Sequence, residues 1–424
     1  MSPVKIALIG GGSAYTPELV DGLIRCYDEL PVAELALMDI DAGRLSILAG
    51  LSQRMFARAG RPVRVTATGD RRRAIDGATF VCTLIRVGGM DARIQDERIP
   101  LKYGVIGQET TGPGGFAKAL RTIPPLLAIA RDVVELAPAA WIINYTNPSG
   151  IITEAIATYT EARVLGLCSG PWGWTRAVLQ AMGASPTRAT VEYAGLNHLG
   201  WITRVVVDGQ DRLAEAIDAI SAAGWAIDGD LMRALGAIPC PYLAYYYHRE
   251  RKLEQARAAA QTRGEQVKAI EADLLRAYAD PALASKPELL KQRGGGGYSD
   301  VATAAMLALY HNRGDRQYIN TLNRGAIASL PEAAVVEVAC VVDQTGARPI
   351  VYGDLPPAAR GLASAVKAYE QLTVRAAATG DYRLALQALL AHPLVASYAI
   401  AAPLLDELLA ANRAYLPQFA RDRG

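Results

Sequence analysis

The N-terminal part of the chain alternates between two patterns of hydrophobic and polar residues. Short apolar runs are typical of buried parallel strands, and stretches in which apolar residues recur every three or four positions are typical of one face of a helix. Strands are predicted at residues 5–9, 34–38, 63–68, 80–85, 140–145 and 164–168, and helices at 17–27, 42–59 and 118–136. Strands that alternate with helices in this way form a parallel sheet with helices on both faces.

The pattern changes after the last of these strands. Extended segments are predicted at 187–193, 202–207 and 334–343, and helices at 249–279, 302–308, 359–378 and 384–415. Because proline cannot donate the hydrogen bond of a helix interior, Pro393 and Pro403 are expected to interrupt the last helix. We therefore predict an α/β fold: a Rossmann-like parallel sheet at residues 1–167 and a mixed, mostly helical α+β domain at 168–424.

Composition and charge exclude several classes of protein. The 424 residues are 51% hydrophobic and 20% charged, as in a globular chain. The 44 Lys and Arg residues against 42 Asp and Glu give a net charge of +2, so nucleic acid is not expected as a partner. No apolar stretch approaches the roughly 20 residues that span a bilayer, so no membrane partner is expected either. The N-terminus lacks a secretory signal and the five cysteines are scattered, which predicts reduced thiols and a cytoplasmic location.

A glycine cluster joins the first predicted strand to the first predicted helix. Gly10, Gly12 and Ser13 lie where backbone amides at a helix N-terminus can approach a pyrophosphate. Asp39 ends the second predicted strand, where a carboxylate can accept hydrogen bonds from an adenosine ribose. Tyr15 replaces the third glycine of the usual G-x-G-x-x-G pattern. The pattern alone therefore fits either an NAD site or an α/β turn without a ligand.

Two polar loops accompany later elements of the predicted sheet. Residues 104–120 place Glu109 among glycines and threonines ahead of a helix, and loops of this kind commonly lie over a binding site. Asn147 follows the strand at 140–145, and ligands bind at the carboxyl ends of such strands. Its amide can donate and accept hydrogen bonds, which suits a hydroxyl-rich substrate. A surface loop and an Asn-Pro turn are the alternatives.

A cysteine and a histidine can meet at one edge of the predicted sheet. Cys168 ends the strand at 164–168, and His198 lies between two extended segments. Thiolate and imidazole suit a divalent transition metal, and two protein ligands leave positions open for substrate oxygens. The alternative is a buried cysteine and a core histidine without a metal.

Four tyrosines are concentrated in one short segment: Tyr242, Tyr245, Tyr246 and Tyr247. Their spacing places some of them on one face of a helix. A tyrosine acts as a base only where a nearby positive charge lowers its pKa towards the working pH, and a metal ion could supply that charge. Aromatic packing in the core is the alternative.

Together these motifs resemble glycoside hydrolase family 4, the NAD- and metal-dependent glycosidases, and within it the 6-phospho-β-glucosidases. The resemblance is carried by the segments IGGGSAYTPELV, RVGGMDARIQDERIPLKYGVIGQETTGPGG, INYTNPSG, GLNHLGW, PYLAYYY and NRGAIASLPEAAVVEVACVVD. It implies a lactate/malate dehydrogenase-like fold, with NAD bound by residues 1–167 and with a metal-binding and catalytic domain at 168–424. It also implies a homodimer or homotetramer.

The resemblance assigns roles to matching residues. Four would bind NAD, namely Gly10, Gly12, Ser13 and Asp39. Two would hold a divalent ion, most simply Mn²⁺, namely Cys168 and His198. Three would contact a phosphoglycoside substrate, namely Arg93, Asn147 and Arg293, with the last facing the phosphate. Tyr242 would be the catalytic base, and Glu109 a carboxylate that raises its basicity.

The reaction implied is hydrolysis of 6-phospho-β-glucosides by a transient oxidation. Removal of hydride from C3 to NAD makes the C2 proton acidic enough for Tyr242 to take; the C1 substituent leaves, water adds, and the hydride returns. Relatives usually have Asn or Asp directly after the metal cysteine, where this chain has Ser169. Three alternatives stay open: a hydroxy-acid dehydrogenase, a glycosidase for α-linked or unphosphorylated substrates, and a sensor that has lost catalysis.

Overall fold

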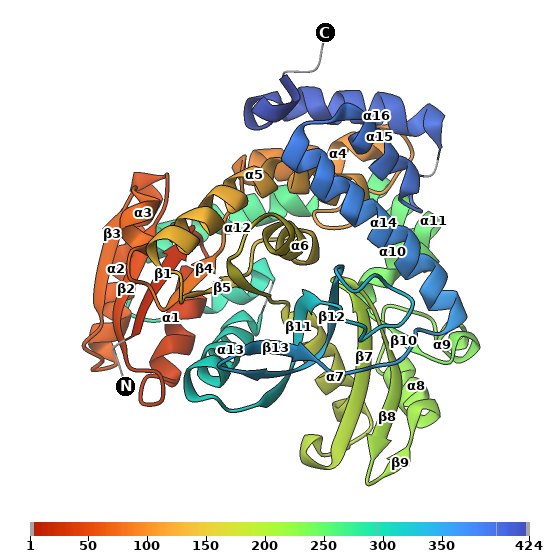
Figure 1. Cartoon of the computed structure of the whole chain (residues 1–424), viewed down its shortest axis with the longest axis horizontal. Coiled ribbons are helices and arrows are strands. Elements are labelled where there is room, and N and C mark those ends of the chain that lie inside the picture. The colour runs from red at the N-terminus through yellow and green to blue at the C-terminus, as the bar shows by residue number, and fades with distance from the viewer. Residues whose placement is uncertain (1–3, 295, 396, 421–424) are drawn as a thin grey trace.

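The computed structural model describes residues 4–294, 296–395 and 397–420 (Figure 1). Residues 1–3, the start of the N-terminal segment considered above, lie outside this range. The N-terminal half is built on six strands: β1 (Val4–Ile9), β2 (Val32–Met38), β3 (Arg64–Thr68), β4 (Phe80–Thr83), β5 (Trp141–Asn144) and β6 (Arg163–Gly166). They are parallel and lie in the order β3-β2-β1-β4-β5-β6, the order of a Rossmann fold. The predicted parallel sheet is confirmed.

The same sheet continues beyond β6 in antiparallel strands. These are, in spatial order, β11 (Asp315–Leu322), β12 (Val335–Asp343), β7 (Ala189–Leu196), β8 (Leu199–Val207) and β10 (Ile238–Pro239). Two short strands, β13 (Gly346–Pro349) and β9 (Gln210–Asp211), pair with β12 and β8. Strands from before and after residue 167 belong to the same sheet. The predicted division of the chain at this residue therefore stays a prediction.

Helices cover both parts of the sheet. The N-terminal part contributes α1 (Thr16–Arg25), α2 (Ala42–Arg58), α3 (Arg71–Ile75), α4 (Gly89–Lys102), α5 (Gly112–Leu136), α6 (Ser149–Tyr159) and α7 (Ser169–Ala181). The C-terminal part contributes α8 (Leu213–Ala222), α9 (Gly229–Leu235), α10 (Ala244–Tyr247), α11 (Arg249–Ala258), α12 (Arg263–Ala279), α13 (Tyr298–His311), α14 (Pro357–Thr379), α15 (Tyr382–Ala391) and α16 (Tyr398–Ala411). Figure 1 shows α14, α15 and α16 beside α4 and α5, so the last helices of the chain form one layer with two helices of the N-terminal part.

Several predicted helix boundaries are wrong. α5 begins at Gly112 rather than at 118, because its first turn packs directly on the preceding loop: a Cβ at Gly114 would lie 2.2 Å from the carbonyl oxygen of Gln108. The helix predicted at 249–279 is two helices, because Thr262 and Glu265 form a capping box that starts α12. α4 was not predicted, since GMDARIQDERIPLK shows no apolar stripe.

The two prolines of the last predicted helix behave differently. α15 ends before Pro393, as predicted, but Pro403 lies inside α16. Pro403 is on the exposed face, while the adjacent Leu404 and Leu405 are fully buried and hold the helix against the core. Packing therefore outweighs the one lost hydrogen bond.

The parallel strands bring candidate residues to one edge of the sheet. Gly10 follows β1, Asp39 follows β2, Arg86 lies just beyond β4, Asn147 beyond β5 and Cys168 beyond β6. All five cysteines are buried and unbridged. Within the described ranges, no helix has both the length and the apolar character needed to cross a membrane.

Candidate active site

The turn after β1 fits closely between the ends of β2 and β4. Gly10 has φ +98°, and a Cβ there would lie 2.3 Å from the carbonyl oxygen of Leu84, so only glycine is accommodated. The N–H of Gly12 donates to Asp39 Oδ2 at 2.8 Å. The glycine turn and the carboxylate predicted to hold NAD are therefore in contact, next to the N-terminal end of α1.

Ser13 closes this turn, and Arg293 lies beside it. The Ser13 N–H donates to the Gly10 carbonyl at 3.0 Å, and its Oγ accepts from Tyr15 N–H at 3.2 Å. The Arg293 guanidinium lies over the Tyr15 ring at 4.2 Å and pairs with Glu271 at 2.5 Å. Arg293 thus borders the glycine turn after β1, and its contact with a sugar phosphate stays a prediction.

Cys168 and His198 come together as the sequence predicted. Their Sγ and Nε2 atoms are 3.6 Å apart, and both side chains are buried. A zinc ion held tetrahedrally by one thiolate and one imidazole, with bonds of about 2.3 and 2.0 Å, places the two donor atoms about 3.5 Å apart, and other divalent transition-metal ions have bonds of similar length. The observed separation therefore fits a single ion bound by both residues. Nowhere in the described chain do three or more His, Cys, Asp or Glu ligands gather.

Each of the two residues is held by its local backbone. Cys168 is the N-cap of α7, and its Sγ accepts from Gly170 N–H at 3.3 Å. His198 lies in the tight turn between β7 and β8 with φ +62°, which is uncommon for a residue with a side chain. Ser169, the residue directly after this cysteine, is the half-buried first residue of α7.

The hydrogen bonds of His198 select one tautomer. Its Nδ1 lies 2.9 Å from Thr110 Oγ1, whose hydroxyl donates to Gln108 Oε1 at 2.9 Å. Thr110 therefore accepts from His198 Nδ1–H, and the Nε2 lone pair is left facing Cys168. Burial lowers the pKa of His198 to about 4, so the ring is neutral, as a metal ligand must be. Sequence reasoning missed Thr110, although it lies in the GQETTGPGG segment.

Tyr242 is the tyrosine of the cluster that lies against His198. Its ring stacks on His198 with centroids 3.9 Å apart and planes at 5°. Two other members have structural partners: Tyr246 Oη is 3.3 Å from His392 Nε2, and Tyr247 Oη accepts from the Trp201 indole at 3.3 Å. The stack favours Tyr242 as the base.

The phenol of Tyr242 is difficult to ionise in the protein alone. Burial, then the neighbouring Cys168, and to a smaller degree Glu109 raise the pKa of Tyr242 well above its usual value. As the sequence analysis expected of a tyrosine base, Tyr242 therefore needs a nearby cation to lower its pKa before it can accept a proton.

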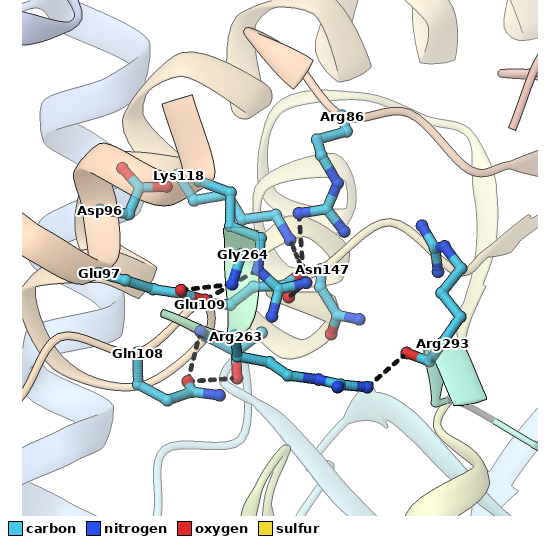
Figure 2. Close-up of polar contacts among 12 residues, drawn as sticks. Arg86, Asp96, Glu97, Gln108, Glu109, Lys118, Asn147, Arg263, Gly264 and Arg293 are labelled. Atoms are coloured by element: carbon cyan, nitrogen blue, oxygen red, sulfur yellow. Dashed lines mark hydrogen bonds and ion pairs between the residues drawn. The ribbon is translucent and has the colours of Figure 1, made fainter. Parts of the chain in front are cut away.

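Glu109 lies at the centre of a cationic cluster (Figure 2). Its carboxylate pairs with Arg86 at 2.8 Å, with Arg93 at 2.5 Å and with Lys118 at 2.6 Å. Burial favours the neutral acid, but Arg86, Lys118 and Arg93 outweigh it and hold the pKa of Glu109 well below its usual value. Burial and Arg86 lower the pKa of Lys118 to about 7. Arg86 and Lys118 were not predicted, although they lie within or just after the RVGG and TGPGG segments.

Arg93 and Asn147 border this cluster. Arg93 also pairs with Glu97 at 2.8 Å, one turn further along α4. Figure 2 shows Asn147 beside the Glu109 cluster, and its Nδ2 donates to Tyr298 Oη at 3.5 Å. Two of the three residues predicted to contact the substrate therefore flank the same carboxylate.

Comparison with known proteins identifies the family. The family model described as "Family 4 glycosyl hydrolase" matches residues 5–184, and that of its C-terminal domain matches 193–395. A probable 6-phospho-beta-glucosidase of Bacillus subtilis is 47% identical over 98% of both chains. A 6-phospho-beta-glucosidase of Escherichia coli is 38% identical over 98% of this chain and 97% of its own.

Solved structures agree with these matches. The 6-phospho-beta glucosidase of Thermotoga maritima, solved with manganese, NAD+ and glucose-6-phosphate, has a TM-score of 0.91 and 35% identity over 97% of this chain and 99% of its own. A malate dehydrogenase of Cryptosporidium parvum has a TM-score of 0.54 at 15% identity over 89% and 99%, which confirms the predicted fold class. The chain belongs to family 4 of the glycosyl hydrolases.

Proposed function

We propose that the protein hydrolyses 6-phospho-β-glucosides with NAD and a divalent ion, most simply Mn²⁺. One observation carries the proposal: Tyr242 stacks on His198, whose Nε2 faces Cys168 Sγ at 3.6 Å. A base and two metal ligands thus lie together beyond the carboxyl ends of a Rossmann sheet. Relatives named 6-phospho-beta-glucosidase at 47% and 38% identity support the same substrate class.

The residues of the chain have separate tasks in this reaction. Bound NAD supplies a reversible hydride acceptor for C3 of the sugar, and the bound ion supplies Lewis-acid charge beside the neighbouring oxygens. Cys168 and His198 would hold the ion. Tyr242 would take the proton from C2, and the carboxylate of Glu109 would raise the basicity of the Tyr242 phenol. This role agrees with the direction in which Glu109 shifts the pKa of Tyr242, although burial and Cys168 raise that pKa more.

Binding residues surround these reacting groups. Four would hold NAD, namely Gly10, Gly12, Ser13 and Asp39. The Asp39 carboxylate would accept hydrogen bonds from NAD with the lone pairs that the Gly12 N–H does not use. Three would bind the sugar and its phosphate, namely Arg93, Asn147 and Arg293. Arginine suits the phosphate because its planar guanidinium offers two parallel donors.

We also propose a division of the chain and a setting for it. Residues 1–167 would bind NAD, and 168–424 would carry the metal and Tyr242. The enzyme would work in the cytoplasm as a homodimer or homotetramer, with neither nucleic acid nor membrane as a partner. Five unbridged cysteines and a net charge of +2 support this setting.

Release of nitrophenol from 4-nitrophenyl β-glucoside 6-phosphate tests the proposed function. Under reducing conditions, activity should require both NAD and Mn²⁺ and should be lost in Cys168→Ser. Cys26→Ser is the matched control, because Cys26 is a buried thiol at the end of α1 with its Sγ on the Leu23 carbonyl. Turnover of only the α-linked or unphosphorylated analogue would overturn the substrate, and inactivity on all of them would overturn the proposal.

A further inference from the structure

A buried carboxylate lies close behind the metal-ligand pair and has no role so far. Glu337 is in the middle of β12, opposite Asn320 of β11 and Gly195 of β7, and is 1% exposed. The surrounding strand, VVEVACVVD, is otherwise apolar until its last residue. A charged residue at such a position costs several kcal/mol unless its surroundings compensate it.

Three donors converge on this carboxylate. Tyr193 Oη donates to Oε2 at 2.8 Å, and the side-chain amides of Asn197 and Asn320 donate to Oε1 at 3.0 and 2.8 Å. An asparagine amide nitrogen can only donate, so these contacts favour the ionised acid. No Lys, Arg or His in the described ranges pairs with Glu337, and burial raises its pKa to about 7 despite the three donors. The three donors can hold an ionised Glu337, but full ionisation needs a positive charge that no neighbouring side chain of the described ranges supplies.

Asn197 connects Glu337 to both metal ligands. It precedes His198 in the turn between β7 and β8, and its side-chain amide lies close enough to Cys168 to favour the thiolate by lowering the pKa of that thiol. The negative charge of Glu337 is close enough to raise the pKa of Cys168, after burial as the main cause. A divalent ion with one thiolate and one neutral imidazole carries a net charge of about +1, which one carboxylate would balance.

We propose that Glu337 is a positioning residue of the metal centre: its carboxylate balances the charge of the bound divalent ion and, through Asn197, orients Cys168 and the turn that carries His198. The inference rests on the proposed function, which places the ion there. Partners that orient metal ligands in this way typically change metal affinity 10- to 100-fold when they are altered.

Mn²⁺ titration of the NAD-loaded enzyme, read by the electron paramagnetic resonance signal of free Mn²⁺, tests the inference. Glu337→Gln keeps the shape and the acceptor for both asparagines but removes the charge, and should weaken Mn²⁺ binding at least tenfold while NAD binding changes less than threefold. Tyr193→Phe is the matched control, because it removes one hydrogen bond to Glu337 and keeps its charge, so its Mn²⁺ affinity should stay within threefold.

Other outcomes would overturn the inference. Mn²⁺ binding by Glu337→Gln within threefold of the wild type, even with a lower melting temperature, would leave Glu337 a purely structural residue. If that variant does not fold, Asn197→Ala removes the same link and should lose at least tenfold in Mn²⁺ affinity; unchanged affinity would contradict the proposal. Wild-type protein that binds Mn²⁺ but hydrolyses no glycoside would refute the proposed function alone.

Discussion

Replacing Glu109 with Gln should destabilise the protein through one specific charge. The substitution removes the carboxylate shared by Arg86, Arg93 and Lys118. Arg93 keeps Glu97 as a partner at 2.8 Å. Lys118, whose pKa is already lowered to about 7, can release its proton in an assay at pH 8. Arg86 alone is left charged and without a carboxylate partner.

The loss of stability in Glu109→Gln follows from the one unpaired charge on Arg86. Breaking a buried ion pair by removing one partner costs about 3–5 kcal/mol, and the partial exposure of Arg86 favours the lower value. The entropy of unfolding is about 2.1 cal/mol/K per residue, or about 0.9 kcal/mol/K for 424 residues. A loss of about 3 kcal/mol in the free energy of unfolding therefore lowers the melting temperature by about 3–4 °C.

Double variants, measured by thermal unfolding at pH 8 without ligands, separate the cations. Adding Arg86→Met to Glu109→Gln should restore most of the lost melting temperature, whereas adding Lys118→Met should restore little. Equal rescue by both, or a Glu109→Gln variant within 1 °C of the wild type, would refute the assignment of charge in this cluster.

Three further predictions concern the cofactor turn, Lys118 and the base. Gly10→Ala should abolish the thermal stabilisation of the protein by NAD, because its Cβ would overlap the Leu84 carbonyl; stabilisation like that of the wild type would contradict the tight turn. Lys118 has a pKa of about 7 in the folded protein against 10.5 when unfolded, so the folded state binds fewer protons and stability rises with pH between these values. The gain in melting temperature from pH 7 to pH 9 should therefore shrink in Lys118→Met, and an unchanged gain would argue against this titration. Tyr242→Phe keeps the stack on His198 and should lose at least 100-fold in kcat with Mn²⁺ affinity within threefold; near-normal turnover would exclude Tyr242 as the base.

The parts of the site predicted from sequence are those that strand ends bring together. Cys168 ends a strand-like run and His198 lies between two extended segments, so sheet geometry alone could place them near one edge. Gly10 and Asp39 follow the first two strands in the same way. Local pattern and fold class were therefore sufficient to place these four residues near one edge of the sheet.

The remaining contacts depend on side chains from distant segments. Nothing in the pattern of the chain indicates that Arg86, Arg93 and Lys118 converge on Glu109, because α4 has no apolar stripe and the first turn of α5 contains helix-breaking glycines. Glu337 did leave a signal, a carboxylate in an apolar strand, but its partners lie on β7, on β11 and in the turn after β7. Such contacts follow from tertiary packing and could not be read from periodicity.

Incorporation of solvent deuterium at C2 of the sugar product tests the central claim most directly. The enzyme would turn over 4-nitrophenyl β-glucoside 6-phosphate in deuterium oxide with NAD and Mn²⁺, and the product would be analysed by nuclear magnetic resonance. Proton removal from C2 by Tyr242 predicts deuterium at C2 of the glucose 6-phosphate formed, with no net NADH. Turnover that leaves C2 unlabelled, or that proceeds equally well in enzyme stripped of NAD, would contradict the account.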